Sequence, residues 1–544
     1  MASGNDPANV AYIIAENGFY YVAYKEKVKV PEIVVSSKGV ANGLSEEYND
    51  GWDFGPDSYS PTSTSAIPYT ETVGWQEAWN YAQINNINKI VSKSNNKYII
   101  SNPIYLNPNG VFTNPLEIDG QNSLIQISSS NLALNPIEIS NNPNNTTGQP
   151  MYPLKLHGFI FDGNGSTSNY TTINFNQYGY TGNNPDIMIE IYGNKFQNGS
   201  NGNIIVEQQS YTLSIHDNIF LNVGANGPIF INGQNSNCGL FIYANEFIAG
   251  ALSVGSNAIG INNNDTTTSI SSPMNNAQIY GNYFGNTSNA PTSNISDAIV
   301  CGDPGGAGWN GAIISNNIFN LTAGWINGIA SLGNTAFNIN FNDNISLVPI
   351  TIVVQDGLIS SNLFIGTVTV YGNGNFRGNR IYSTSGYGFA INTGNDRNIV
   401  IDGNTITFNG SSGFAIYFTD TSVTGSTYIV NNNLFNGSNI GINTLSGLIF
   451  MGNRTSTGAY PFSPSTPTVP ASATAQQNTN PYPVDVYIYG GDVTEIQITR
   501  NGTAYTVLSV STAIAMSGQA YKLNPGDSIT ITYSTAPSWE WLSD

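Results

Sequence analysis

The stretch Ile191-Tyr-Gly-Asn194-Lys-Phe196 decides the fold, because the same six-residue pattern keeps returning as far as Asn453. Each copy has an apolar residue, two polar or small residues, an asparagine, a variable residue and, in most copies, Phe or another apolar residue. Successive copies place this asparagine 17 to 37 residues apart. The asparagines of the pattern are Asn194, Asn218, Asn245, Asn282, Asn317, Asn344, Asn362, Asn379, Asn404, Asn433 and Asn453.

A unit of this length is too small to bury its own apolar side chains, so it must stack on its neighbours. The apolar runs are short and β-like, and the Gly and Asn between them tolerate the left-handed backbone of a tight corner. Apolar stretches with helical periodicity, which a helical solenoid needs, are absent between Ile191 and Asn453. The pattern therefore predicts an all-β chain built on a right-handed parallel β-helix, with its asparagines stacked as an internal or corner ladder.

Changes in composition and periodicity divide the chain into four parts. Residues 1–70 are expected to form an N-terminal β-hairpin unit and a linker, and residues 71–455 the β-helix. Residues 456–482, rich in Pro, Ser and Thr, are typical of a linker or an extended cap strand. Residues 483–544 regain strand-like alternation and predict a sandwich-like antiparallel β-domain.

The first part contains Asn17-Gly18, a strong hairpin signal between two apolar runs. Glu32 to Val35 is a candidate third strand of the same unit. Residues 38–70 carry an acidic group in which a calcium site is conceivable, although its spacing matches no known loop motif and favours a solvated linker. The members of this group are Glu46, Glu47, Asp50, Asp53 and Asp57.

A capping helix is expected over about residues 72–84. Trp75, Ala78, Trp79 and Ala82 recur at i, i+3, i+4 and i+7, which is the apolar stripe of an amphipathic helix. The end of a solenoid leaves strand edges and core open to water. We therefore expect this helix to cover the first coil.

Only 9% of the 544 residues are charged, 11% are aromatic, and the net charge is -19. The aromatic content argues against disorder, and the negative charge argues against nucleic-acid binding. No apolar run is long enough to span a membrane. The residues Met1 to Pro7 lack a secretory signal. Low charge with many aromatic residues is typical of an extracellular β-protein. A protein of this type without an export signal is expected to be a virion component. The alternative is a processed chain or an unusual export route.

The order of helix, early coils, Asn-rich ladder and separate β-domain resembles the pectate-lyase-like β-helix superfamily, in particular viral tailspikes and related adhesins. The segment Trp75 to Ile127, with Leu116-Glu-Ile-Asp-Gly120, looks like the capped start of that fold. Gly18 to Pro56 and Asn524-Pro-Gly-Asp-Ser-Ile-Thr530 look similar to surface proteins of archaeal viruses from hot springs. The tailspike resemblance implies a homotrimer on a virion surface.

Members of that superfamily that cleave polysaccharides use paired carboxylates, or a basic residue with calcium. The polygalacturonase motifs and a pectate lyase calcium cluster are not found. We therefore assign no catalytic residue, and we expect no metal and no cofactor. Two weak carboxylate pairs could meet on neighbouring coils, at the separation of about 5 to 10 Å that hydrolysis needs. They are Asp162 with Glu190 and Asp217 with Glu246. Acidic residues in such turns are more often solvated or cap a backbone amide.

Tyr192, His216, Tyr243 and Tyr280 stand two positions before their ladder asparagines. If the preceding apolar residue points inward, alternation points these four side chains outward as an aromatic column. Such a column suits sugar binding, because aromatic faces meet C–H groups and neutral polar neighbours bond hydroxyls. The alternative is cross-coil stacking that only stabilises the sheet.

The main hypothesis is a non-enzymatic spike or fibre on a virion surface that attaches to a host glycan or glycoprotein. Other virion proteins are expected to bind through a terminal domain. A polysaccharide depolymerase of the same fold is one alternative. A structural surface-layer protein or cellular adhesin is another.

Overall fold

The computed structural model covers the 544-residue chain. It describes residues 10–16, 19–24, 32–35, 74–76, 78, 79, 82, 86–106, 116–128, 136–140, 153–164, 172–176, 188–199, 204–209, 212–222, 227–233, 239–251, 258–262, 277–289, 298–301, 312–320, 329–331, 339–392, 398–418, 427–437, 448–456, 458, 459, 466–480 and 483–543.

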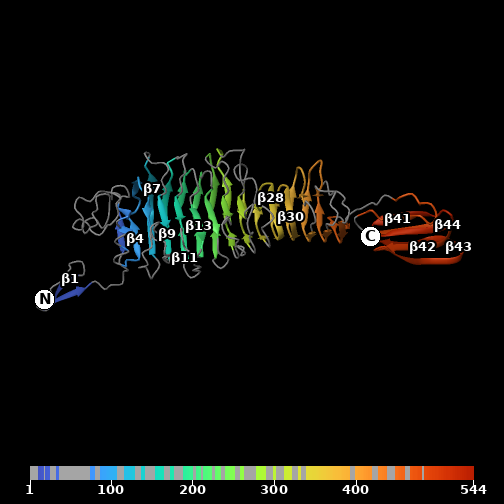
Figure 1. Cartoon of the computed structure of the whole chain (residues 1–544), viewed down its shortest axis with the longest axis horizontal. Coiled ribbons are helices and arrows are strands. Elements are labelled where there is room, and N and C mark those ends of the chain that lie inside the picture. The colour runs from blue at the N-terminus through green and yellow to red at the C-terminus, as the bar shows by residue number, and fades with distance from the viewer. Residues whose placement is uncertain are drawn as a thin grey trace.

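A long shaft of parallel strands fills the middle of the molecule, and an antiparallel domain follows at its C-terminal end (Figure 1). Each strand of the shaft pairs with the equivalent strand one coil away, which confirms the predicted parallel β-helix. The strands form three stacks, here called the first, second and third faces. Short apolar runs separated by polar corners produce this arrangement, because each run buries alternate side chains inside the coil.

The first face contains β3 (Glu32–Val35), β4 (Lys89–Ser92), the first halves of β7 (Leu116–Ile127) and β9 (Leu154–Asp162), β11 (Met188–Tyr192), β14 (Thr212–His216), β17 (Leu240–Tyr243), β20 (Ala277–Tyr280), β23 (Ile313–Ser315), β26 (Asn340–Asn342), the second halves of β28 (Ile350–Ser360) and β30 (Val368–Arg377), β33 (Asn398–Asp402), β36 (Thr427–Asn431) and β38 (Leu448–Met451).

The second face contains β5 (Lys97–Ile100), the second halves of β7 and β9, β12 (Lys195–Gln197), β15 (Ile219–Leu221), β18 (Glu246–Ala249), β21 (Tyr283–Asn286), β24 (Ile318–Phe319), β27 (Ile345–Ser346), β29 (Leu363–Ile365), β31 (Arg380–Ser383), β34 (Thr405–Phe408), β37 (Leu434–Asn436), β39 (Arg454–Thr455) and the antiparallel β40 (Gly458–Ala459).

The third face contains β6 (Ile104–Tyr105), β8 (Ile137–Ser140), β10 (Ile173–Asn176), β13 (Ile204–Gln209), β16 (Ile229–Gly233), β19 (Ile259–Asn262), β22 (Ile299–Cys301), β25 (Ile329–Ser331), the first halves of β28 and β30, β32 (Phe389–Asn392) and β35 (Ile416–Phe418).

The asparagine ladder lies at the corner between the first and second faces. The side-chain carbonyl of Asn218 accepts bonds from the backbone N and the Nδ2 of Asn194, at 3.0 and 3.2 Å. Asn194 Nδ2 also donates to the Leu156 carbonyl. The same pair of links to the next asparagine recurs up to the last one, where Asn433 donates to Asn453. All the ladder asparagines are buried, so the predicted internal ladder is confirmed.

The core beside the ladder is aromatic. On the second face a column of fully buried phenylalanines stacks with ring centroids 4.8 to 5.2 Å apart. The column contains Phe161, Phe196, Phe220, Phe247, Phe284 and Phe319. Polar ladder and apolar column together fix the register of the coils.

The backbone is helical at the described residues Trp75, Gln76, Ala78, Trp79 and Ala82, within the expected capping helix. Trp75 packs edge-on against aromatic rings of the first coils. The Gln76 side chain bonds both the carbonyl and the amide of one β6 residue, at 3.1 and 2.7 Å. The segment thus satisfies a strand edge that the end of the solenoid leaves open.

Strands β1 (Val10–Glu16) and β2 (Phe19–Tyr24) pair antiparallel, as predicted for the hairpin. The proposed third strand differs from expectation, because β3 pairs in parallel with β4 of the shaft. Ile33 and Val35 are buried in the common core, so Glu32–Val35 belongs to the solenoid rather than to the hairpin unit. The acidic group over residues 46–57 lies outside the described residues.

The C-terminal domain is a five-stranded antiparallel sheet, which confirms the antiparallel part of the prediction. Its strands are β41 (Ala475–Gln477), β44 (Ser528–Thr535), β42 (Val484–Arg500), β43 (Thr503–Leu523) and β45 (Ser538–Ser543). Trp539 and Trp541 complete its core in an edge-to-face pair.

The segment expected to be a linker is partly built into this domain. β41 pairs with β44, and Trp539 Nε1 donates to the Pro467 carbonyl at 2.6 Å. Tyr533 donates its hydroxyl to the Pro470 carbonyl at the same distance. Residues 466–480 therefore form an extended strap over the domain, which was the alternative to a free linker.

Candidate functional site

The outer side of the first face carries a continuous row of stacked rings, here called the aromatic row. Strand register places its members directly above one another. Successive ring centroids are 4.5, 5.0, 4.6 and 4.8 Å apart, and the planes are within 14° of parallel. The row contains the four predicted residues Tyr192, His216, Tyr243 and Tyr280, and one that the sequence analysis missed, His157.

Stacking covers the ring faces and leaves the edges at the surface, since every member is half-buried. Cross-coil stacking is therefore present, and sugar binding by these residues stays a prediction. The end of the row differs, because the strand position after Tyr280 is held by the small Ser315. Burial raises the pKa of Tyr192 and Tyr280. Their hydroxyls therefore stay protonated, as hydrogen-bond donors, throughout the neutral range.

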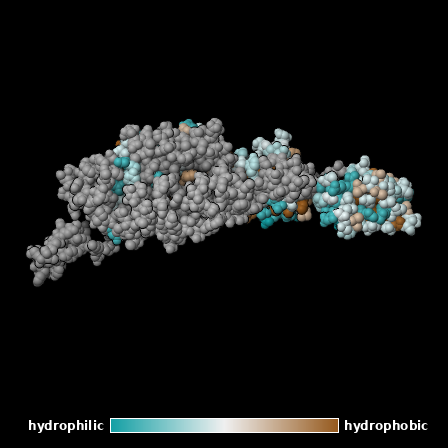
Figure 2. All heavy atoms as spheres, viewed as in Figure 1, coloured by the Kyte–Doolittle hydropathy of each residue, from teal (hydrophilic) through white to brown (hydrophobic). Residues whose placement is uncertain are grey.

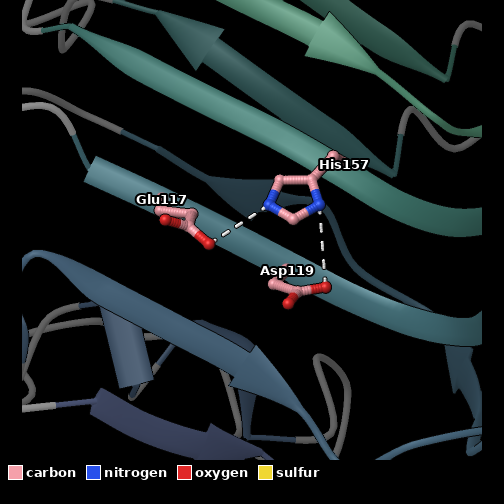
Figure 3. A group of neighbouring side chains, drawn as sticks. All are labelled: Glu117, Asp119 and His157. Carbon is pink, nitrogen blue, oxygen red and sulfur yellow. Dashed lines mark hydrogen bonds and ion pairs between the residues drawn. The ribbon is translucent and has the colours of Figure 1, made fainter. Parts of the chain in front are cut away.

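A polar group stands at the start of the row, where β7 lies beside β9. His157 Nε2 is 3.3 Å from Glu117 Oε1, and His157 Nδ1 is 3.7 Å from Asp119 Oδ1 (Figure 3). Glu117 and Asp119 are alternate residues of one strand, so both point outward. The imidazole thus faces one carboxylate with each nitrogen. Asp119 is nearly buried, whereas Glu117 is partly open to solvent.

A second row, of alternating charge, runs beside the first members of the aromatic row. Register stacks Lys89, Glu117, Lys155 and Glu190 on successive coils. Lys89 Nζ lies 3.2 Å from Glu117 Oε1, and Lys155 Nζ lies 2.9 Å from Glu190 Oε2. The hydrogen bond to Glu190 raises the pKa of Lys155. These pairs are partly exposed, so each adds at most about 1 kcal/mol to stability.

The first predicted carboxylate pair, Asp162 with Glu190, is not brought together. Glu190 lies on the first face and forms an ion pair with Lys155. Asp162 lies on the second face, where its carboxylate accepts a bond from Gln197 Nε2 at 2.8 Å and from the Asn164 amide. The corner between the faces separates the two groups, which the spacing of the pattern did not reveal.

The second pair, Asp217 with Glu246, also has other surroundings. Asp217 occupies the corner position with left-handed backbone and bonds to His216 Nδ1 at 2.7 Å. Glu246 begins a strand of the second face, opposite Ile219. Asp217 is a solvated corner residue, which was the alternative reading for these acids.

The missed residues left a signal in the sequence. Leu156-His-Gly-Phe159-Ile-Phe161 is the repeated pattern with Phe159 in place of the asparagine, and its register with the next coil places His157 opposite Tyr192. Asp119 takes the same place one coil earlier, but two extra residues follow it before register resumes at Ser123. That irregularity hides the equivalence.

The group of Glu117, Asp119 and His157 has the donors of a metal site or of an acid–base centre. One ligand atom from each residue can be chosen so that all three lie within 4.8 Å of one another. Nitrogen and carboxylate donors together suit borderline cations such as Zn²⁺. Two close carboxyl groups are also the minimum for glycoside hydrolysis.

Comparison with known proteins adds structural likeness only. No protein-family model matches the sequence, and no curated protein matches it. A mutant tailspike protein of E. coli bacteriophage HK620, in complex with a pentasaccharide, aligns with 99% of this chain and 98% of its own, at a TM-score of 0.51 and 12% identity. A double mutant of that tailspike gives a TM-score of 0.51 and 12% identity over 99% and 97% of the two chains. At this identity the likeness establishes the fold.

Among the residues that the structure describes, no helix has the length and apolar character needed to cross a membrane.

Proposed function

We propose that this chain is a virion surface spike that attaches to its host by binding a glycan along the first face. The aromatic row carries the proposal. Its exposed edges bear the hydroxyls of Tyr192, Tyr243 and Tyr280 on a rigid support, and the charged pair of Lys155 and Glu190 lies beside its Tyr192 end. Adjacent coils repeat at about 4.8 Å, so an extended glycan lying along the shaft would meet a regular series of donors.

The fold supports the same reading. A tailspike of similar fold is known in complex with a pentasaccharide, so a shaft of this type is compatible with oligosaccharide binding. Membership of the pectate-lyase-like superfamily and origin from an archaeal virus are the finer parts of the proposal, and they rest on the sequence resemblance. A host glycan or glycoprotein is the proposed partner.

The experiment is a binding titration of purified host surface polysaccharide with the wild-type chain and with Tyr243→Phe and Tyr280→Phe. Each change keeps the ring and removes a hydroxyl, so affinity should fall by about 3- to 10-fold for each lost hydrogen bond. Tyr382→Phe is the matched control, because Tyr382 is an exposed tyrosine of the second face. Equal affinity in all four proteins would contradict the proposed surface.

A depolymerase is the second candidate, favoured by one observation. Glu117 and Asp119 bring carboxylate oxygens within 4.8 Å, close to the separation of about 5 Å found in retaining glycosidases. The chain-length distribution of the polysaccharide after incubation separates the two functions. Attachment leaves the chains intact. Shortening that Glu117→Gln abolishes would establish cleavage.

We also propose that the chain assembles as a homotrimer through its C-terminal domain, which would contact other virion proteins as well. β43 pairs only with β42 among the described strands, leaving one long edge open. Tyr505, Val507 and Ile514 expose apolar surface on that strand. Such an edge invites pairing with another chain.

A further inference from the structure

We propose that Glu117, Asp119 and His157 form a binding site for a divalent transition-metal cation of the Zn²⁺ type. The three side chains come from neighbouring strands of a rigid sheet and converge on the outer side of the first face (Figure 3). Their ligand atoms lie within 4.8 Å of one another, and small side-chain rotations would bring them to the bond lengths of about 2.0 to 2.2 Å that zinc requires.

The surroundings hold two of the ligands in place. The Tyr192 ring stacks on the His157 ring with centroids 4.5 Å apart, which fixes the plane of the imidazole. Asp119 Oδ1 accepts the Gln121 backbone amide at 3.0 Å, and Asp119 Oδ2 accepts Gln121 Nε2. Outer hydrogen bonds of this kind orient metal-binding carboxylates. These contacts hold the imidazole plane and the Asp119 carboxylate in place before a cation binds. Because the two nitrogens of His157 face different carboxylates, a cation on one nitrogen requires the carboxylate that faces the other to rotate toward it.

The backbone is also shaped around the carboxylate. Gly158 has a φ of +75°, and a Cβ at that position would lie 3.1 Å from Asp119 Oδ1. A side chain there would crowd the oxygen that faces His157. Glycine at this position thus preserves both the left-handed turn and the space beside the proposed ligand.

The donor set selects the class of cation. Calcium prefers six to eight oxygen ligands, and magnesium keeps an octahedral shell with several waters. A single imidazole with two carboxylates suits Zn²⁺ or a neighbouring transition metal, with solvent completing the shell on the exposed side. Lys89 Nζ and His157 Nε2 both face Glu117 Oε1, at 3.2 and 3.3 Å, so a cation bound at this oxygen competes with Lys89 for it.

The test is a calorimetric titration of the chelator-stripped full-length protein with ZnCl₂. We expect one zinc per chain in the wild type and in His216→Phe. His157→Phe keeps a ring stacked on Tyr192 but removes both nitrogens, and should weaken binding by at least about 100-fold, beyond the effect of an outer-shell change. The chain contains only these two histidines, and His216 lies beside a single carboxylate, Asp217. His216→Phe is therefore a matched control.

A thermal melt without metal verifies that each variant is folded. Zinc binding of equal strength in folded His157→Phe would overturn the proposal, and so would a wild-type protein that takes up no zinc. Gln121→Gly suits the left-handed backbone at this position and should lower affinity by roughly 10- to 100-fold. Displacement of zinc by millimolar calcium would show an oxygen site instead and refute the assigned class. Metal binding is measured without glycan, so this test is independent of the proposed function.

Discussion

At the scale of single residues, the corner before each ladder asparagine explains much of the sequence pattern. The residue at that corner has positive φ in every coil from Asn194 to Asn453. Most of these residues are Gly, Asn or Asp, which adopt left-handed backbone at low cost. Ala244 and Ser361 are the exceptions, with φ of +52° and +57°. The ladder position requires asparagine because of its side-chain hydrogen bonds. The corner position selects its residue type through the positive φ alone.

This difference predicts that Ala244→Gly stabilises the shaft by about 0.5 to 1 kcal/mol, because relief of left-handed strain exceeds the added chain entropy. The reverse change at an equivalent corner, Gly193→Ala, should destabilise the shaft by a similar amount. An added Cβ meets no atom within 4 Å there, so backbone strain is the only cost. Calorimetric unfolding of both variants at one scan rate tests the pair. Shifts of the same sign would contradict the strain argument.

Replacing a ladder asparagine should cost more stability than replacing a corner residue. Asn282 Oδ1 accepts the backbone N and the Nδ2 of Asn245, and Asn282 Nδ2 donates to the Ile242 carbonyl. Asn282→Ala removes these buried hydrogen bonds, at about 1 to 3 kcal/mol for each buried group left without a partner. Asn245 Nδ2 keeps its bonds to the Ile215 and Tyr243 carbonyls. We expect the shaft transition to fall by several degrees in calorimetry. Asn398→Ala is the control for loss of an asparagine outside the ladder, because Asn398 is exposed at the start of β33 and has no positive φ.

At the scale of the coil, one coil has a small residue in the phenylalanine column and a large residue on the neighbouring face. Ser346 stands in the phenylalanine column between Phe319 and Phe364. Phe341, from the first face of the same coil, fills the space, with centroids 6.0 and 6.4 Å from those two rings. The large side chain stands on the first-face side of the ladder corner instead of the second-face side, and the core stays closed.

The exchange predicts coupling between the two positions. Phe341→Ile alone should cost about 1 to 3 kcal/mol through a cavity, and Ser346→Phe alone a similar amount through overpacking. The double variant restores the usual pattern and should cost clearly less than the sum. Unfolding free energies of the four proteins measure this coupling. Simple additivity would mean that the two side chains do not share one space.

The buried Tyr98 predicts how the stability of the shaft changes at alkaline pH. Burial raises the pKa of Tyr98 above its ordinary value of 10.0, and the hydroxyl donates to the Val35 carbonyl at 2.6 Å. A raised pKa means that the folded state holds its proton more tightly, so this stability is complete below pH 10 and is lost as pH rises further. Tyr98→Phe should be less stable at pH 8, but its stability should decline less between pH 10 and 11. An unchanged decline would exclude Tyr98 as the cause.

At the scale of the whole molecule, the ladder was predictable in full because its period is written directly in the sequence. The polar group at the start of the aromatic row was not. Phe159 replaces the asparagine in that coil, and an insertion after Asp119 shifts the register. Residues 466–480 have the composition of a linker, yet contacts as distant as Trp539 with Pro467 fix them on the terminal domain. Local pattern predicts repeats well, whereas contacts between distant segments leave no period to find.

The terminal domain gives the last prediction, which concerns assembly. Figure 2 shows apolar surface among the polar residues of this domain, and β43 is exposed along most of its length. An open strand edge with exposed Val507 and Ile514 favours pairing with another chain in water. Charged residues at such an edge block the approach of another chain. We therefore expect Val507→Lys with Ile514→Lys to convert the proposed homotrimer into monomers.

Light scattering after size-exclusion chromatography measures the mass of each species. Tyr382→Lys places the same charge on an exposed position of the shaft and should leave the trimer intact. Calorimetric unfolding of each variant verifies that the terminal domain is still folded. A monomeric wild type would refute the assembly outright. A trimer that survives both lysines would place the contact elsewhere, because an edge carrying two unpaired charges cannot pair with a second chain at low cost.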